Sequence, residues 1–166
     1  MTGSFNLTVV MAALAALPMA VLAHGPDDHA KTPKAAISTG EHPFGVEGDP
    51  GKAGRTISIS MDDRMHYSHS EIRVAKGETV TFVISNKGKL LHELVIGTED
   101  ELKRHAELMR KNPGMEHDEP YMAHVKPGGT ERITWKFTKP GTFMYGCLVA
   151  GHFEAGMKGT VVVAAK

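Results

Sequence analysis

The feature that most constrains the fold of this 166-residue chain is a two-residue alternation of apolar and polar side chains. Successive side chains of a β-strand point to opposite faces, so this alternation is typical of strands that are buried on one face. It is clear at residues 57–61, 72–74 and 133–137 and largely kept at 80–84, and short apolar segments at 94–96, 143–145 and 161–163 complete the series of predicted strands. Turn-forming residues separate these segments, for example Pro127-Gly128-Gly129 and Pro140-Gly141. The pattern predicts an all-β chain that folds as an antiparallel β-sandwich.

One segment interrupts the alternation. Residues 99–112 (EDELKRHAELMRKN) consist of helix-forming residues. Thr98 and Glu101 have the spacing of an N-terminal capping box, and Pro113-Gly114 is a strong stop signal. We therefore expect one helix, at about 99–112, inserted between the strands near residues 96 and 133.

The N-terminus has the features of an export signal. Residues 7–23 form an apolar run, and Val21 and Ala23 occupy the −3 and −1 positions of a signal-peptidase site. A transmembrane anchor is the alternative, but 17 residues interrupted by Pro18 are short for a bilayer span. We expect residues 1–23 to be a signal peptide that directs the chain to the periplasm. After cleavage no stable association with the membrane is expected.

Residues 24–54 are rich in Gly, Pro, Asp and Lys and show no apolar periodicity. This composition predicts a flexible N-terminal arm, followed by a single folded domain at 55–166. The 19 basic residues are balanced by 19 acidic residues. A chain without a basic excess is not expected to bind nucleic acid.

The chain has one cysteine, Cys147, together with 10 His and 10 Met. A single cysteine excludes an intramolecular disulfide and a Cys-rich zinc site. In an oxidising compartment an unpaired thiol needs a role, such as a nucleophile, an intermolecular disulfide or a metal ligand. A nucleophile needs a neighbouring base and an oxyanion donor, and the sequence identifies neither.

A metal site accounts for the cysteine better. Cys147, His152 and Met157 have the spacing Cys-x₄-His-x₄-Met in the loop between the last two predicted strands, and His92 opens an upstream strand. A thiolate, two imidazoles and a thioether are the ligands of a type 1 copper site. These ligands suit both oxidation states of copper, so little has to move when an electron is transferred.

At these residues the chain resembles the cupredoxins, the small blue-copper proteins that include plastocyanin, azurin and rusticyanin. The resemblance covers about residues 55–166 and is specific in Gly151-His152, in the GMKG sequence at 156–159 and in the distant His92. It implies a Greek-key β-sandwich that binds one type 1 copper. The resemblance further implies the roles of the ligands, which are in plane for His92, Cys147 and His152 and axial for Met157.

Within this family, the stretch LLHELVIG at 90–97, the helical insertion and the His-bearing arm are most similar to periplasmic copper-tolerance cupredoxins of the CopI type. In several cupredoxins an Asn directly follows the first His ligand and braces the loop. Here that position is Glu93, and Asn86 is the other candidate for the brace.

Multicopper oxidases and nitrite reductases also contain type 1 copper, but they need further copper ligands. In this chain Gly146 and Leu148 flank the cysteine, and the sequence contains no His-x-His pair. We therefore expect a copper-binding protein rather than an enzyme, with Cu(I) oxidation left open.

Two functions remain, namely copper tolerance by binding periplasmic copper ions, and electron transfer with a transient periplasmic redox partner. Apolar residues around His152 would favour transient docking of a redox partner. Surplus His and Met residues favour copper tolerance, because imidazole with thioether is a copper ligand set. They predict an auxiliary copper site, although each Met could instead be a packing residue and each His a surface residue. Its candidate ligands are His105, Met109, Met115, His117, Met122 and His124, with His24 as a further candidate at the cleaved N-terminus.

Overall fold

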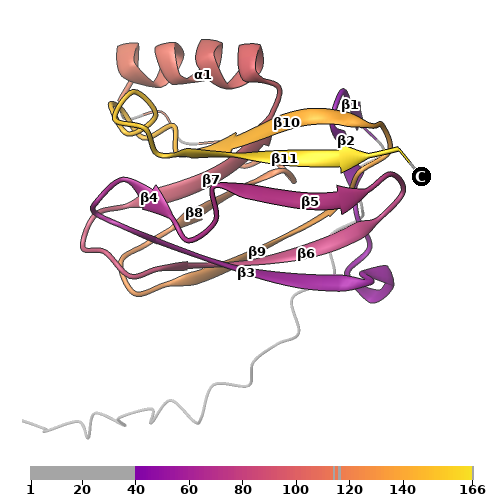
Figure 1. Ribbon diagram of the computed structural model, residues 1–166. Coiled ribbons are helices and arrows are strands. Elements are labelled where there is room, and N and C mark those ends of the chain that lie inside the picture. The colour runs from indigo at the N-terminus through magenta and orange to yellow at the C-terminus, as the bar shows by residue number, and fades with distance from the viewer. Residues whose placement is uncertain (1–39, 114, 116, 166) are drawn as a thin grey trace, which may run out of the picture. The chain divides into compact units, whose positions relative to one another are not determined.

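The computed structural model describes residues 40–113, 115 and 117–165. These residues form two β-sheets packed face to face, with one helix outside them (Figure 1). One sheet has six strands in the order β1-β2-β9-β6-β3-β4, and the other has five in the order β5-β11-β10-β7-β8. The strands are β1 (Glu41–His42), β2 (Gly45–Glu47), β3 (Arg55–Asp62), β4 (His66–Tyr67), β5 (Glu71–Ala75), β6 (Thr79–Asn86), β7 (His92–Gly97), β8 (Met122–Val125), β9 (Thr130–Lys136), β10 (Gly141–Gly146) and β11 (Lys158–Ala164).

The two-residue alternation determines which side chains enter the core between the sheets. In β6, Val80, Phe82 and Ile84 are buried, while the residues between them are partly exposed. In the antiparallel neighbour β9, Ile133 lies opposite Phe82 and is buried with it. The predicted β-sandwich with one inserted helix is confirmed.

Two of the strand pairings are parallel, namely β3 with β6 and β5 with β11. The chain leaves the six-stranded sheet after β4, forms β5 in the other sheet, and then returns to form β6 beside β3. A parallel pair needs such a crossover connection, whereas an antiparallel pair needs only a turn. The alternation of side chains is the same in both cases, so the sequence pattern did not distinguish them.

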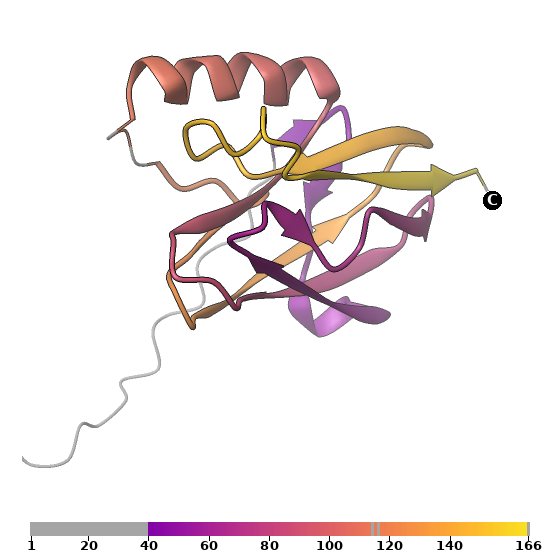
Figure 2. The same ribbon diagram turned by 60° about the vertical axis from the view of Figure 1, so that its left-hand side comes forward.

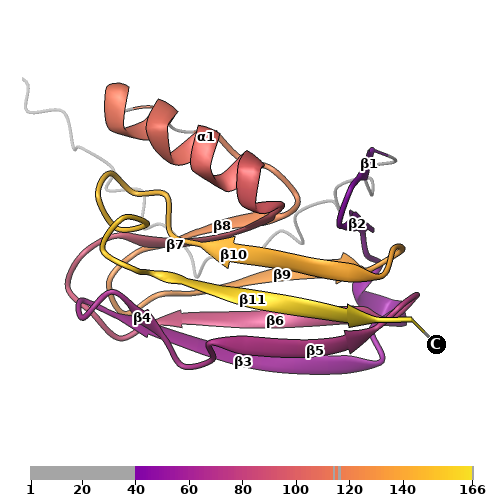
Figure 3. The ribbon, with the colours of Figure 1, turned by 45° about the horizontal axis from the view of Figure 1, so that its top comes forward.

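Strand β7 departs from the alternation because all six of its residues are buried. Leu94 and Ile96 enter the core between the sheets, whereas Val95 faces the other way, into a second apolar cluster. The helix α1 (Glu99–Lys111) covers that outer face of the five-stranded sheet (Figures 2 and 3). It contributes Leu102 and Ala106 to the second cluster, and its predicted capping box between Thr98 and Glu101 is present.

The predicted boundary between the arm and the domain at residue 55 is wrong. Residues 40–54 include β1, β2 and a short 3₁₀ helix (Pro50–Lys52), and β2 pairs with β9. Phe44 is only 2% exposed, and its carbonyl accepts a hydrogen bond from Trp135 Nε1 at 3.0 Å. Gly45 has φ +132°, and a Cβ there would lie 2.1 Å from the Lys136 carbonyl oxygen. One buried aromatic side chain thus anchors a segment whose composition is typical of a flexible arm.

The predicted signal peptide and the remainder of the predicted arm, including His24, lie outside the described residues. Within the part of the chain that the structure describes, no helix is both long enough and apolar enough to span a membrane.

Candidate metal centre

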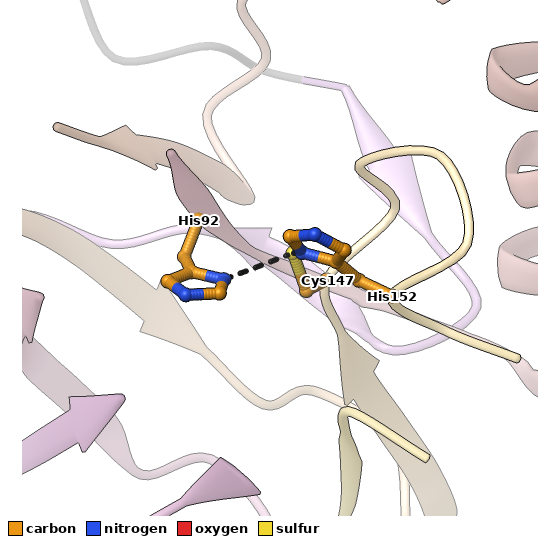
Figure 4. A group of neighbouring side chains, drawn as sticks. All are labelled: His92, Cys147 and His152. Carbon is orange, nitrogen blue, oxygen red and sulfur yellow. Dashed lines mark hydrogen bonds between the residues drawn. The ribbon is translucent and has the colours of Figure 1, made fainter. Parts of the chain in front are cut away.

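Three of the predicted ligands come together at one end of the sandwich (Figure 4). His92 is the first residue of β7, Cys147 directly follows β10, and His152 lies in the loop before β11. Cys147 Sγ lies 3.2 Å from His152 Nδ1 and 4.0 Å from His92 Nδ1. All three donor atoms lie within 4.8 Å of one another, so small movements of the side chains bring them to the distance of about 2.0–2.3 Å at which they would bind one metal ion.

The loop from Cys147 to Met157 is held by its own backbone. The Cys147 N–H donates to the Met157 carbonyl at 3.0 Å, and the Met157 N–H donates to the His152 carbonyl at 3.0 Å. Gly151 and Gly156 have φ of 87° and 98°, which only glycine adopts readily. These contacts place Met157, the fourth predicted ligand, in the same buried cluster as Cys147.

The residue before the cysteine must be glycine for a steric reason. A Cβ at Gly146 would lie 2.7 Å from the ring of Phe153. The Phe153 ring therefore packs directly on the backbone of β10, and this contact fixes how the loop folds back over the strand. The glycine next to the predicted ligand allows that close approach.

Burial controls the protonation of the site. It raises the pKa of the Cys147 thiol to about 12, although the backbone N–H of Glu93, which donates to Sγ at 3.4 Å, acts to lower it. Burial also lowers the pKa of His152. At neutral pH the metal-free site therefore has a protonated thiol and a neutral His152, and a metal must displace the thiol proton to bind.

Asp63 orients His92, a role for which the sequence contains no signal. His92 Nε2 lies 3.1 Å from Asp63 Oδ1, on the side of the ring opposite the cysteine. The backbone N–H groups of Lys89 and Leu90 also donate to this carboxylate, and the first of these bonds contributes most to lowering the pKa of Asp63. A carboxylate on one ring nitrogen leaves the other, Nδ1, free to bind a metal. Asp63 is 29 residues from His92, so only the fold brings the two together.

Glu93 and Asn86 brace two different parts of the site. The Glu93 side chain is 1% exposed, and its Oε1 accepts a hydrogen bond from the Leu148 N–H at 2.7 Å. It therefore ties β7 to the cysteine loop. The Asn86 side chain donates to the Leu90 carbonyl at 2.7 Å and holds the turn that leads into His92.

Comparison with known proteins identifies the metal. Residues 55–164 match the family of copper-binding proteins described as plastocyanin/azurin family. The chain belongs to this family. Its cofactor is therefore type 1 copper, and the thiolate and two imidazoles brought together here are the donors that such a copper requires.

The similar proteins are also cupredoxins. The chain is 48% identical over 121 residues to a copper-resistant cuproprotein CopI of Rubrivivax gelatinosus, which covers 73% of each chain. It is 32% identical over 152 residues to a protein of the same name from Pseudomonas aeruginosa, covering 72% of this chain and 82% of the other. The solved structure of a reduced auracyanin from Roseiflexus castenholzii superposes with a TM-score of 0.58 at 30% identity, over 68% of this chain and 98% of that one.

The candidate auxiliary residues fall into two groups. The methionines pack against apolar neighbours, since Met109 and Met122 are buried in the second cluster and Met115 packs against it. The histidines gather instead beneath α1, where the rings of His105 and His117 lie 4.6 Å apart. His124 joins them through its Nε2, which lies 3.0 Å from the His117 carbonyl oxygen. His24 lies outside the described residues.

The predicted apolar surface around His152 is smaller than expected, because Leu148 and Phe153 are buried in the second cluster. Two other apolar residues, for which the sequence pattern contains no signal, lie beside the predicted copper site. Leu90 and Leu91 are 48% and 41% exposed, directly before the predicted ligand His92. Together with the neighbouring exposed Ala150, they give this cupredoxin an apolar surface next to its metal.

Proposed function

We propose that this cupredoxin is an exported, periplasmic protein that confers copper tolerance by binding copper at a redox-active type 1 centre. The ligands we propose are His92, Cys147 and His152 in the plane, with Met157 in the axial position. The observation that carries the proposal is the convergence of one buried thiol and two imidazole nitrogens within 4.8 Å. The 48% identity to a protein named as a copper-resistant cuproprotein supports tolerance as the role.

The donor side chains of the site are held in a fixed geometry in which they can bind copper. Bound copper supplies a one-electron couple, and the protein supplies a rigid set of donors. The cysteine loop is closed by its backbone hydrogen bonds, Asp63 holds the ring of His92, and Glu93 ties β7 to the loop. Donors held in this way cannot rearrange freely when copper changes its oxidation state, which favours rapid electron exchange.

The role we propose is binding rather than catalysis. Gly146 and Leu148 flank the cysteine, and the sequence has no His-x-His pair to hold further catalytic coppers. Export to the periplasm is supported by the apolar run at residues 7–23 and its small residues at Val21 and Ala23. A single unpaired thiol is also compatible with an oxidising compartment when a metal occupies it.

The test is a deletion strain of the source organism, grown on increasing copper and complemented with variants of the gene. We expect wild type to restore tolerance and Cys147→Ser to fail, because the variant lacks the thiolate ligand. His66→Ala is the matched control, since His66 is exposed and belongs to the other sheet. Immunoblots of the periplasmic fraction check that all variants are exported in equal amounts. Full tolerance with Cys147→Ser would contradict the proposal.

Electron transfer is the second candidate function, and the exposed Leu90 and Leu91 favour it. Electron-transfer partners dock briefly on small surfaces, and these leucines lie directly before a copper ligand. If the protein is a carrier, Leu91→Glu slows electron exchange with a soluble c-type cytochrome used as probe by about 10-fold or more. Exchange as slow in wild type as in the variant, with tolerance lost on gene deletion, would leave copper tolerance as the function.

A further inference from the structure

The ladder between β7 and β10 ends before it reaches the cysteine loop. The last pair in its register is Val95 opposite Gly146. If the register continued by two residues, Glu93 would lie opposite Leu148, and the two would exchange backbone hydrogen bonds. Glu93 is buried, so its N–H and C=O groups need other partners at this point.

Side chains supply the partners that the ladder does not. The Glu93 N–H donates to Cys147 Sγ at 3.4 Å, and the Leu148 N–H donates to Glu93 Oε1 at 2.7 Å. The Glu93 carbonyl oxygen accepts the hydroxyl of Tyr67 at 2.6 Å. Of these three contacts, only the last comes from outside β7 and the cysteine loop. Tyr67 therefore holds the residue that donates to the predicted cysteine ligand.

Tyr67 reaches β7 from the other sheet. It is the second residue of β4, where it lies opposite Met61 of β3, and its ring is buried in the core between the sheets. Burial raises the pKa of the Tyr67 hydroxyl, which therefore keeps its proton at neutral pH. A carbonyl oxygen only accepts, so the hydroxyl is a permanent donor to Glu93.

Local contacts define the turn before Tyr67. Met65 has φ 62°, in the left-handed region that residues other than glycine rarely adopt, and its N–H donates to the Asp62 carbonyl at 3.1 Å. The Asp62 carboxylate accepts the Arg64 N–H at 3.0 Å and forms an ion pair with the Arg64 guanidinium at 2.7 Å. The position of Tyr67 relative to β3 therefore depends on the hairpin itself.

The same hairpin contacts two successive residues of β7. Asp63 Oδ1 lies 3.1 Å from His92 Nε2, and the Tyr67 hydroxyl bonds to the carbonyl of Glu93. The β3–β4 hairpin thus holds one predicted copper ligand directly. It also holds, through Glu93, the hydrogen-bond donor of a second predicted ligand, Cys147.

We propose that Tyr67 is a positioning residue that raises the reduction potential of the type 1 copper, because it holds the Glu93 N–H against Cys147 Sγ. The inference rests on the redox-active centre of the proposed function and names a residue that sets its potential. Tyr67 acts through Glu93 and does not itself contact the copper.

The direction of the effect follows from the charge on the sulfur. The step is the transfer of one electron from an external donor, in which Cu(II) is reduced to Cu(I) and no proton moves. Cu(II) withdraws more charge from the thiolate than Cu(I) does, so the sulfur is more negative in the reduced state. An N–H that donates to the sulfur therefore stabilises the reduced state more than the oxidised state, and the potential rises.

The bond to the sulfur depends on how Glu93 is oriented. In a β-strand the N–H and C=O groups of one residue point to the same side, so a bond at the carbonyl also fixes the direction of the N–H. Without the Tyr67 hydroxyl, the Glu93 carbonyl loses its partner, and a buried group without a partner is costly. The residue then turns to find another donor, and its bond to Cys147 Sγ weakens.

The experiment compares Tyr67→Phe with Tyr145→Phe in the purified copper protein. The Tyr145 hydroxyl also donates to a backbone carbonyl, that of His69, and the two tyrosine rings are in contact with centroids 5.1 Å apart. Each variant therefore loses one hydroxyl from the same part of the core. Only the Tyr67 hydroxyl bonds to the residue that donates to the sulfur, so Tyr145→Phe is the matched control.

Voltammetry measures the potential, and the visible spectrum reports the sulfur-to-copper transition. We expect the ratio of Cu(II) affinity to Cu(I) affinity to be about 3- to 10-fold higher in Tyr67→Phe than in wild type. For a one-electron couple this is a potential lower by about 30–60 mV. The visible band is expected to remain and to move to longer wavelength, because the sulfur is less stabilised. Tyr145→Phe is expected to keep the wild-type potential and band.

Hydrogen exchange of the metal-free proteins, followed by NMR, gives a readout that does not depend on copper. In Tyr67→Phe the Glu93 amide is expected to exchange about 3- to 10-fold faster relative to the Ile96 amide, whose N–H donates to the Tyr121 carbonyl.

Replacement of Tyr67 by para-aminophenylalanine restores an N–H donor at the same place. Because an amine is a weaker donor than a phenol, we expect a potential between those of Tyr67→Phe and wild type. If Tyr67→Phe does not fold, a lower potential in this variant than in wild type is the expected result.

Two results would overturn the inference. One is a potential in Tyr67→Phe that equals that of wild type. The other is an equal fall in potential in Tyr67→Phe and Tyr145→Phe, because loosening of the core, and not the contact with Glu93, would then lower the potential. A wild type without the type 1 band would contradict the proposed function and this inference with it, whereas an unchanged potential with an intact type 1 band contradicts this inference alone.

Discussion

The two faces of β7 make different sites from neighbouring residues. The inner face presents His92, Leu94 and Ile96 to the core between the sheets, where the cysteine loop completes the copper site. The outer face presents Glu93 and Val95 to the region covered by α1 and the segment that follows it. The inner site depends on pairing between strands, and the outer cluster depends on the inserted helix. Strand β7 thus contributes residues to both the copper site and the outer cluster. Substitutions on one face can therefore change one of these regions without the other.

The largest effect is expected at the inner site, from Cys147→Ser. The substitution removes the thiolate, so the intense visible absorption of the copper protein is expected to disappear. Because burial raises the pKa of the Cys147 thiol to about 12, its proton is bound at neutral pH and leaves when copper binds. Wild type is therefore expected to release about one proton per copper at pH 7 and to bind copper more tightly as pH rises.

Calorimetry of copper binding to wild type in two buffers of different ionisation enthalpy measures the number of protons released per copper bound. His152 contributes none, because burial lowers its pKa and the ring is already neutral at pH 7. Release of no proton would show that the metal-free thiol is already ionised. Retention of the visible colour by Cys147→Ser would refute the ligand assignment.

The next largest effect concerns Glu93, whose side chain lies on the outer face of β7 and whose backbone N–H donates to Cys147 Sγ. Glu93→Ala leaves the buried Leu148 N–H without its acceptor, and leaving such a group unpaired costs about 1–3 kcal/mol. Glu93→Gln keeps an oxygen acceptor at the same place and is expected to cost less. Urea denaturation of the metal-free proteins measures both. Equal losses for the two variants would show that the charge, rather than the hydrogen bond to the loop, stabilises this region.

An effect of similar size is expected from Asp63→Asn, which acts on the inner site alone. The carboxylate accepts the Lys89 N–H at Oδ2 and holds the Leu90 N–H and His92 Nε2 at Oδ1, whereas the amide of the variant has one acceptor oxygen and therefore weakens the hold on His92. Loss of such a partner lowers metal affinity by about 10–100-fold. Competition with a copper chelator measures this loss. Unchanged affinity at the type 1 site would mean that Asp63 shapes the turn and does not orient the ligand.

The smallest effect is expected from Met109→Leu, on the helix that covers the outer face. The substitution conserves volume in an apolar cluster, so it is expected to cost less than about 1.5 kcal/mol of stability. It removes one of the predicted thioether ligands, and the copper content is expected to stay the same. Thermal unfolding and metal analysis check both results. A lower copper content would restore Met109 as a ligand.

The fold could be predicted because each strand carries its own pattern. The alternation in β6 and the capping box at Thr98 are local signals that depend on neighbours a few residues away. The direction of the β3 and β6 pair has no such signal, because parallel and antiparallel strands alternate in the same way. The role of Phe44 was missed because a single buried ring does not alter the composition of an arm-like segment.

The candidate site likewise contains some residues that the sequence predicts and others that only the structure reveals. The spacing Cys-x₄-His-x₄-Met lies within one loop, so Cys147 and His152 could be predicted from the sequence, and the structure brings them together with His92. Met157 stays the predicted fourth ligand. The carboxylate of Asp63 was not found, because nothing in its own turn indicates a partner 29 residues away. Glu93 was recognised as a departure from the usual brace, but its contact with the cysteine loop and with His124 needed the packing of β7.

By itself, therefore, the sequence determined the chemistry of the copper site, because donor types and short spacings are properties of the chain. Tertiary structure alone decided which of the Met and His residues outside the type 1 site pack against apolar side chains and which lie next to one another. It buried Met109 and Met122 among apolar side chains, brought the rings of His105 and His117 into contact, and placed His124 Nδ1 3.1 Å from Glu93 Oε2 on the outer face of β7. The physical reason is that the burial of a side chain and its contact partners depend on segments that are distant in the chain. Such long-range contacts produce no periodic pattern in the sequence.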